Sequence, residues 1–274
     1  MSEDDWGPPG LPFHSAGKPF LTTSFEEAAA RLLFLSERRW PAGWLVGPGG
    51  CGKTSLLRHV RCELRRLGVE ALLISLCGVD GDDFWPVIAS ALGGRECEPG
   101  LAARKMARAL LVASSMMSRP VTLLLDDADR GGIGLMDQVD ALVRMAEGVT
   151  PRHTVVLATA GEPPTDDLAR RIDLRAEVRP LTVEETASYI AHRLREVDSA
   201  TVFSAEAVDE IFAATAGVPA AVGRLADLSL LAAHAANVRT VSREVATSAV
   251  TELGPNDDEM LVAISAQRPA RFCT

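Results

Sequence analysis

Apolar and polar residues follow two alternating patterns over residues 25–180. Short runs of consecutive apolar residues are typical of strands that are buried on both faces. Between these runs the apolar residues recur every three or four positions, which predicts amphipathic helices. Strands separated by helices indicate an α/β fold with a parallel sheet covered on both faces. The predicted strands are 44–46, 69–75, 120–125 and 154–159, and the predicted helices are 24–35, 55–67, 84–92, 101–115 and 135–147, with a short helix and its exit over 170–179.

From residue 182 the pattern is helical throughout. Thr182, followed three residues later by Glu185, forms a capping box that predicts the start of a helix. Residues 1–24 are rich in Pro and Gly and predict an arm laid over the surface, although a disordered leader would have the same composition. The helices expected after residue 180 are 182–194, 203–214, 219–236 and 242–253.

These patterns predict four parts of the chain. The core should contain the sheet, and the smaller domain after it should be all-helical. The tail has mixed charge and carries no motif. The expected boundaries are 1–24 for the arm, 25–180 for the core, 181–253 for the helical domain and 254–274 for the tail.

A glycine-rich loop lies between the first predicted strand and the helix after it. Glycines allow backbone N–H groups to approach a polyphosphate closely, and the start of the helix adds its positive dipole end. Lys53 would reach the β- and γ-phosphates, and the Thr54 hydroxyl would be a ligand of Mg²⁺. An ordinary glycine-rich turn is the alternative, but strand, spacing, Lys and Thr together favour a nucleoside triphosphate site. The loop is Gly47-Pro48-Gly49-Gly50-Cys51-Gly52-Lys53-Thr54, and Ser55 extends the site.

Polar residues also end the third and fourth predicted strands. The carboxyl ends of parallel strands form the rim where ligands bind, so we expect Asp126 to hold Mg²⁺ together with Thr54. Asp127 is the candidate for polarising the attacking water. Thr159 ends the next strand at the same rim, where a hydroxyl can sense the γ-phosphate or orient water. A solvated turn would also explain the acidic run, and a simple strand end would also explain Thr159.

Composition narrows the class of protein. Hydrophobic residues make up 47% of the 274 positions, which is ample for a packed interior. The net charge of −9 and pI of about 5.1 provide no global positive field for nucleic acid or an anionic membrane. The five cysteines lack paired spacing, so neither zinc nor disulfides are expected. The acidic N-terminus is unlike a signal peptide and no apolar run would span a membrane, which indicates a cytoplasmic protein.

With these motifs placed, the chain resembles the AAA+ superfamily and, within it, the ExeA-like ATPases of general secretion pathway protein A. The resemblance extends from about Pro12 to Leu253. Its more specific part follows residue 180. The matching stretches are Leu181-Thr182-Val183-Glu184-Glu185-Thr186, Tyr189-Ile190, His192-Arg193-Leu194, Phe203-Ser204-Ala205-Glu206-Ala207, Gly217-Val218-Pro219, Leu225-Ala226-Asp227 and Leu230-Leu231-Ala232-Ala233.

The resemblance implies a P-loop NTPase core of the AAA+ type, a small helical lid and ATP bound with Mg²⁺ at their junction. It also implies self-association into a ring or a transient oligomer. In such assemblies an arginine of one subunit completes the neighbouring site, because its charge stabilises the transition state. Arg171 is the nearest match to that arginine, with Arg170 and Arg175 as rivals. The alternative is that this residue is a surface arginine held in an ion pair.

Two residues depart from the family pattern. Relatives usually have Gly-x-Pro-Arg at the start of the third lid helix, with an arginine that senses the γ-phosphate, whereas Ala220 follows Pro219 here. Arg224 lies one helical turn further on and could substitute by position, because residues i and i+4 share a face. Many hydrolysing relatives have a Glu where this chain has the shorter Asp127. Both changes bear on hydrolysis more than on binding.

Three functions are compatible with these residues. The first is Mg²⁺-dependent ATP hydrolysis, with the nucleotide state coupled to lid movement and assembly. The second is an ATP-binding switch or scaffold with little hydrolysis, which Asp127 and Ala220 favour. The third is a transposition-type DNA-associated ATPase adaptor, which the acidic balance disfavours. We expect the first, with an unidentified protein partner and no nucleic acid. Secretion-anchoring relatives carry a membrane helix and a wall-binding module that this chain lacks, so a secretion role does not follow from the resemblance.

Overall fold

The computed structural model describes residue 13 and residues 19–95, 99–148, 152–161, 165–196 and 202–252. The predicted tail and most of the predicted arm lie outside the described residues, as do Cys97 and Cys273. The chain divides into two compact units. The first comprises Thr23–Gly47 and Gly52–Arg179. The second comprises Pro48–Cys51 and the described residues of Met1–Thr22 and Pro180–Thr274.

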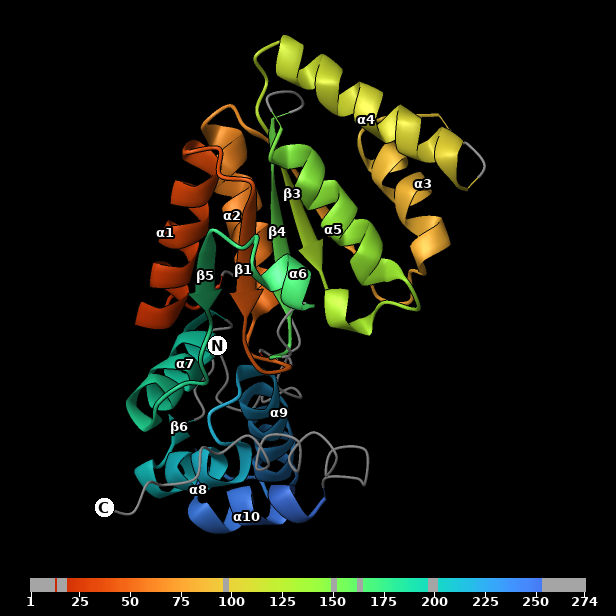
Figure 1. Ribbon diagram of the computed structural model, residues 1–274. Helices are drawn as coiled ribbons and strands as arrows, with labels where there is room; N and C mark the ends of the chain where they lie inside the picture. The colour runs from red at the N-terminus through yellow and green to blue at the C-terminus, as the bar shows by residue number, and fades with distance from the viewer. Residues whose placement is uncertain are drawn as a thin grey trace, which may run out of the picture. The chain divides into compact units, whose positions relative to one another are not determined.

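A five-stranded parallel sheet forms the centre of the first unit (Figure 1). The strands lie in the order β2-β3-β4-β1-β5. Every residue of β3 and β4 is buried, as continuous apolar runs predict for strands covered on both faces. The expected fold class, a parallel sheet flanked by helices, is confirmed. The strands are β1 (Ala42–Val46), β2 (Glu70–Ser75), β3 (Val121–Asp126), β4 (His153–Thr159) and β5 (Leu174–Glu177).

The edge strand β5 is missing from the predicted elements. The sequence predicts a short helix and its exit over 170–179, but helix α6 (Asp166–Ala169) ends before this segment. Among the described strands, β5 pairs only with β1. Only Ala176 of its residues is buried, so the strand has no apolar run that a sequence pattern could reveal.

Helices cover both faces of this sheet (Figure 1). On one face, two helices pack against each other and against the strands. On the other face, a larger group encloses an apolar core that includes Phe84, Leu123 and Leu157. The first group is α1 (Thr23–Glu37) and α2 (Lys53–Arg66), and the second is α3 (Gly81–Ala91), α4 (Leu101–Met116), α5 (Leu135–Ala146) and α6, with the short 3-10 helix η1 (Ala128–Arg130) after β3.

The second unit is helical, as predicted, with a small addition. Residues of all its helices form one apolar cluster around Leu225 and Ile211. The capping box at Thr182 is confirmed, because its backbone N–H donates to Glu185 Oε2 (3.0 Å) and its hydroxyl accepts from the Glu185 N–H (3.2 Å). The addition is a pair of two-residue parallel strands. The elements are α7 (Val183–Glu196), β6 (Val202–Phe203), α8 (Ala205–Thr215), α9 (Pro219–Ala235), β7 (Thr240–Val241) and α10 (Arg243–Thr251).

Two described residues of the predicted arm contact these helices. The rings of Phe13 and Phe20 lie 5.7 Å and 5.6 Å from the ring of Tyr189 on α7. The Phe13 N–H also donates to Asp227 Oδ1 on α9 (3.3 Å). A Cβ on Gly223 would come within 3.1 Å of the Phe13 Cβ, so this glycine makes room for the ring. Within the described part of the chain, no helix is long and apolar enough to cross a membrane.

Candidate functional site

The glycines of the loop are required for different reasons, which are backbone conformation at some positions and close packing at another. Gly52 has φ of 93° and immediately precedes α2, and Gly50 has φ of 77°; both values favour glycine. A Cβ on Gly47 would lie 2.4 Å from the carbonyl oxygen of Val178, so packing alone requires glycine there. Gly49 is different: it is exposed, its φ is not positive, and a Cβ would meet no atom of the described residues within 4 Å. No contact with the described part of the chain explains this glycine.

The side chain of Lys53 is folded towards the loop. Lys53 is the first residue of α2 and is buried, and its Nζ donates a hydrogen bond to the carbonyl oxygen of Gly47 (2.7 Å). An ammonium group has three donors and no acceptor, so it is suited to oxygen ligands. Thr54, the next residue, is half-buried, and Ser55 is exposed. The amino group therefore lies beside the first glycine of the loop.

Asp126 ends β3 with a buried side chain. Its Oδ1 accepts a hydrogen bond from the Asp127 N–H (3.0 Å), and it lies beside Ser75, the last residue of β2. Within the described residues, no group of three or more His, Cys, Asp or Glu side chains could hold a metal. Mg²⁺ binds through few protein carboxylates and completes its shell with water and phosphate. Asp126 and Thr54 fit that kind of site, which a nucleotide would complete.

The two acidic residues that follow, Asp127 and Asp129, lie in different environments. Asp127 is half-buried and has φ of 52°, a left-handed conformation that Asp tolerates better than most residues. Asp129 is exposed, and its Oδ2 accepts a hydrogen bond from the Ala160 N–H (2.9 Å). It thus links η1 to the residue that follows β4. Sequence reasoning did not assign this link, and its one signal was the third acid in Asp126-Asp127-Ala128-Asp129.

Thr159 ends β4 at the same edge of the sheet as the loop. It is buried and lies beside Val46, the last residue of β1. Its carbonyl oxygen accepts from the Gly47 N–H (3.4 Å), and its hydroxyl accepts from the indole N–H of Trp44 (2.9 Å). The structure therefore brings Lys53, Asp126 and Thr159 to the carboxyl edge of the sheet, as predicted for parallel strands. Sequence reasoning missed Trp44.

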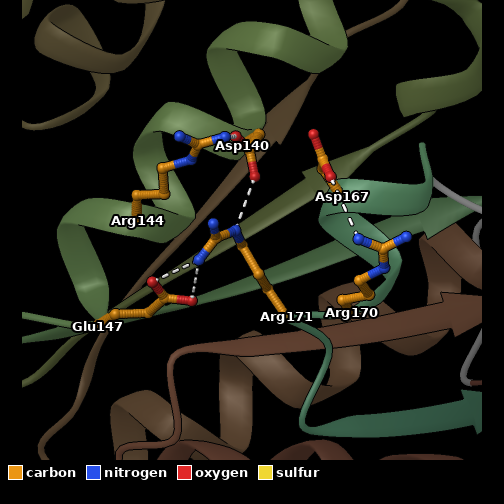
Figure 2. Close-up of polar contacts among 6 residues, drawn as sticks. All are labelled: Asp140, Arg144, Glu147, Asp167, Arg170 and Arg171. Carbon is orange, nitrogen blue, oxygen red and sulfur yellow. Dashed lines mark hydrogen bonds and ion pairs between the residues drawn. The ribbon is translucent and has the colours of Figure 1, made fainter.

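The structure places the three candidate arginines in different environments. Arg171 lies between two carboxylates, that of Asp140 on α5 and that of Glu147 directly after this helix (Figure 2). Its Nε donates to Asp140 Oδ1 (3.0 Å), and its Nη1 donates to both carboxylate oxygens of Glu147 (2.7 and 2.6 Å). The hydrogen bond to Glu147 is the main reason that the pKa of Arg171 is raised above its ordinary value. Asp140 also pairs with Arg144.

The other two arginines are more open. Arg170 turns away from Arg171 towards Asp167 (Figure 2), but the closest N–O distance is 3.8 Å and its side chain is 78% exposed. Arg175 lies on β5, with its guanidinium carbon 5.1 Å from the ring centre of Trp44. Sequence spacing cannot distinguish these environments because they depend on α5 and β1.

The first turn of α9 contacts the loop within the second unit. The Ala220 N–H donates to the carbonyl oxygen of Gly50 (3.2 Å). A Cβ on Gly50 would lie 2.9 Å from the Ala220 Cβ. Arg224, one turn further along α9, is exposed like Ala220, as expected for residues that share a helical face. Cys51, also in the loop, is buried, and its N–H donates to the Pro48 carbonyl oxygen (3.2 Å).

Comparison with known proteins identifies the fold. Residues 39–169 match the family model described as an AAA domain. Cdc6p from Pyrobaculum aerophilum has a TM-score of 0.70 at 15% identity, covering 94% of this chain and 74% of its own. The Aeropyrum pernix ORC1 protein in complex with DNA gives 0.66 at 18% identity, over 94% of this chain and 76% of its own. The Aeropyrum pernix ORC2 protein, solved as ADPNP–ADP complexes, gives 0.62 at 17% identity, over 92% and 74%. No curated protein sequence matches. The chain therefore has a P-loop AAA+ fold like that of Cdc6 and ORC proteins.

Proposed function

We propose that this protein binds ATP with Mg²⁺ and hydrolyses it. The backbone N–H groups of the loop would hold the phosphates, Lys53 would neutralise the β- and γ-phosphates, and Thr54 and Asp126 would hold Mg²⁺. When bound, Mg²⁺ bridges phosphate oxygens and neutralises developing charge. The AAA+ fold and the nucleotide complexes of a structural neighbour support this proposal.

The surroundings of Gly49 support the proposal most directly. Gly49 has an ordinary φ and open space around the missing Cβ, so its contacts with the described residues would allow alanine there. A ligand that approaches the backbone closely supplies the reason for glycine. The position lies in the middle of a loop that ends at the N-terminus of α2, where backbone N–H groups and the helix dipole favour phosphate.

The test compares two alanine variants of neighbouring glycines. Gly49→Ala should retain the wild-type melting temperature but weaken Mg·ATP binding at least about tenfold, measured by calorimetry. Gly50→Ala should lower the melting temperature, because its φ is positive and the Ala220 Cβ is only 2.9 Å away. Undiminished ATP affinity in Gly49→Ala would contradict the role of this loop as a phosphate cradle.

For the transition state we propose Asp127, Thr159 and an arginine of a second subunit. Asp127 would orient the attacking water, Thr159 would contact the γ-phosphate or that water, and Arg224 would replace the family arginine at the start of α9. Arg171 remains the predicted trans arginine, but it would have to release its bonds to Asp140 and Glu147. Arg170 would reach a neighbour without that cost, since its side chain is 78% exposed.

We also propose that the chain is related to the ExeA-like ATPases of the AAA+ superfamily. The segment from Leu181 to Ala233 supports it, since the capping box and the helix starts of that signature coincide with α7, α8 and α9. Nucleotide state would then control assembly of several copies and movement of the helical unit.

Slow hydrolysis with tight binding is a second candidate function, that of a nucleotide switch. Asp127 has a shorter side chain than Glu for contacting the attacking water, and Ala220 has no guanidinium group.

A third candidate, association with DNA, is supported by one observation: α4 carries exposed Arg104, Lys105 and Arg108 and no acidic residue. Anisotropy of a labelled duplex at low salt tests it, because phosphate contacts are strongest there. Absence of binding at low salt would remove this candidate.

A further inference from the structure

Trp44 connects the edge of the sheet to Thr159. Its half-buried side chain belongs to β1, and its backbone lies beside Leu157 of β4, two residues before Thr159. Residues two apart in a strand point to the same face, so Trp44 and Thr159 share one face of the sheet. The indole spans this offset, and its Nε1 lies 2.9 Å from the Thr159 hydroxyl oxygen.

This hydrogen bond has a defined direction. An indole N–H can only donate, so the Thr159 hydroxyl accepts from Trp44, and this bond does not use the hydroxyl's own proton. Threonine is also restricted at χ1 because it is β-branched. The hydroxyl oxygen is therefore held at a defined position at the end of β4, where the carbonyl oxygen of the same residue accepts from Gly47.

A second contact holds the indole from the side of β5. Arg175 lies directly beside Trp44 in the strand register, and its guanidinium carbon is 5.1 Å from the centre of the ring. A cation over the face of a tryptophan is attracted by the ring quadrupole. The carbonyl oxygen of Arg175 accepts from Arg31 Nη1 on α1 (3.0 Å), which anchors this part of the edge strand. Arg175, Trp44 and Thr159 thus form a continuous chain of contacts.

We propose that Trp44 is a positioning residue for nucleotide hydrolysis: its N–H fixes the Thr159 hydroxyl for the γ-phosphate or the attacking water, and Arg175 secures the indole. This inference rests on the proposed ATPase function. A tryptophan that only filled the core would need its ring and not its N–H. The role of the N–H is therefore what the experiment must isolate.

Trp44→Phe removes the N–H and keeps an aromatic ring for Arg175. The variant should lose about tenfold in kcat or more, since small misplacement of a reacting group can cost about a hundredfold. KM for ATP and the melting temperature should change little. Thr159→Val should show a similar loss, and the double variant should lose no more than either single variant. Trp40→Phe is the matched control, because Trp40 packs on Phe34 outside the site.

A binding signal separates this inference from the ATPase proposal. If Trp44 senses the γ-phosphate through Thr159, its fluorescence should differ between the complexes with Mg·ADP and with Mg·ATPγS. The difference should be present in wild type and Trp40→Phe and absent in Trp44→Phe. Nucleotide binding with identical emission in both complexes, or a kcat unchanged in Trp44→Phe, would overturn the inference and leave ATP binding intact. Failure to bind either nucleotide would instead contradict the proposed function itself.

Discussion

The ammonium group of Lys53 lies 2.7 Å from the carbonyl oxygen of Gly47, the first residue of the same loop. The helix start and the strand end are thus joined by one charge-assisted hydrogen bond. On binding a nucleotide, the ammonium group would exchange the Gly47 carbonyl oxygen for a phosphate oxygen. The buried lysine is therefore already close to the position that the proposed function requires.

Replacement of Lys53 by methionine keeps the side-chain length and removes the charge. We expect Mg·ATP affinity to fall about a hundredfold, because the β- and γ-phosphates lose their neutralising group. Calorimetric titration with ATP measures the change. Lys105→Met, at an exposed position of α4, is the matched control and should bind ATP like wild type. Equal affinity in the two variants would contradict the assignment of Lys53.

Arg170 and Arg171, which follow α6, should differ in how their replacement affects stability and ATP turnover. Arg171→Ala should lower the melting temperature, because it removes hydrogen bonds to Asp140 and Glu147 that hold the segment after α6 to α5. Arg170→Ala should leave the melting temperature unchanged, since its contact with Asp167 is long and exposed. If Arg170 acts in trans, its loss should lower turnover only at protein concentrations where assembly occurs.

Mixing inactive variants tests which arginine acts on a neighbour. An arginine variant keeps an intact loop, and Lys53→Met keeps an intact arginine, so a mixed assembly can restore complete sites. Activity that returns on mixing identifies the arginine as one that acts in trans. If Arg171→Ala alone is rescued in this way, Arg171 leaves its partners on α5 when subunits assemble.

The length and charge of residue 127 should control hydrolysis separately from binding. Asp127→Asn keeps the size and tolerates the left-handed backbone, but it removes the carboxylate that would orient water. It should release phosphate more slowly while binding ATP normally. Asp127→Glu should release phosphate faster than wild type, because the longer carboxylate reaches further. Identical rates in all three proteins would exclude residue 127 from the chemistry.

His153 should make stability depend on pH. It is buried at the start of β4, where its Nε2 donates to the Leu142 carbonyl oxygen (3.2 Å), and burial lowers its pKa to about 4. The unfolded chain, with an ordinary pKa of 6.5, therefore binds a proton more readily between these two values. Protonation of His153 should therefore have no effect above pH 6.5 and should lower the free energy of unfolding as the pH drops towards 4, by about 3 kcal/mol at most.

His153→Gln isolates this contribution, because the amide can still donate to Leu142 but does not titrate. Urea unfolding at pH 7 and pH 4.5 should show that wild type loses about 2–3 kcal/mol more than the variant. Parallel losses in the two proteins would show that His153 is not responsible.

Much of the fold could be predicted from the sequence, because the apolar runs of strands, the helical spacing of apolar residues and the capping box at Thr182 are local signals. The strand β5 could not, since an edge strand with only Ala176 buried leaves no periodic signal. The loop and the acids after β3 were also predictable, because the ends of parallel strands meet at one edge of a sheet.

The contacts around the site were not predictable. The link from Trp44 to Thr159 depends on the register between β1 and β4, which are far apart in the sequence. The partners of Arg171 likewise come from α5, and no spacing rule connects them.

We propose ATP turnover by assembled copies of this protein, and phosphate release under saturating Mg·ATP tests this proposal most directly. Measured across a wide range of protein concentrations, the rate per subunit should rise with concentration and then level off. Lys53→Met should show no release at any concentration. Wild-type protein that binds ATP but releases no phosphate at any concentration would contradict the claim and identify a nucleotide switch.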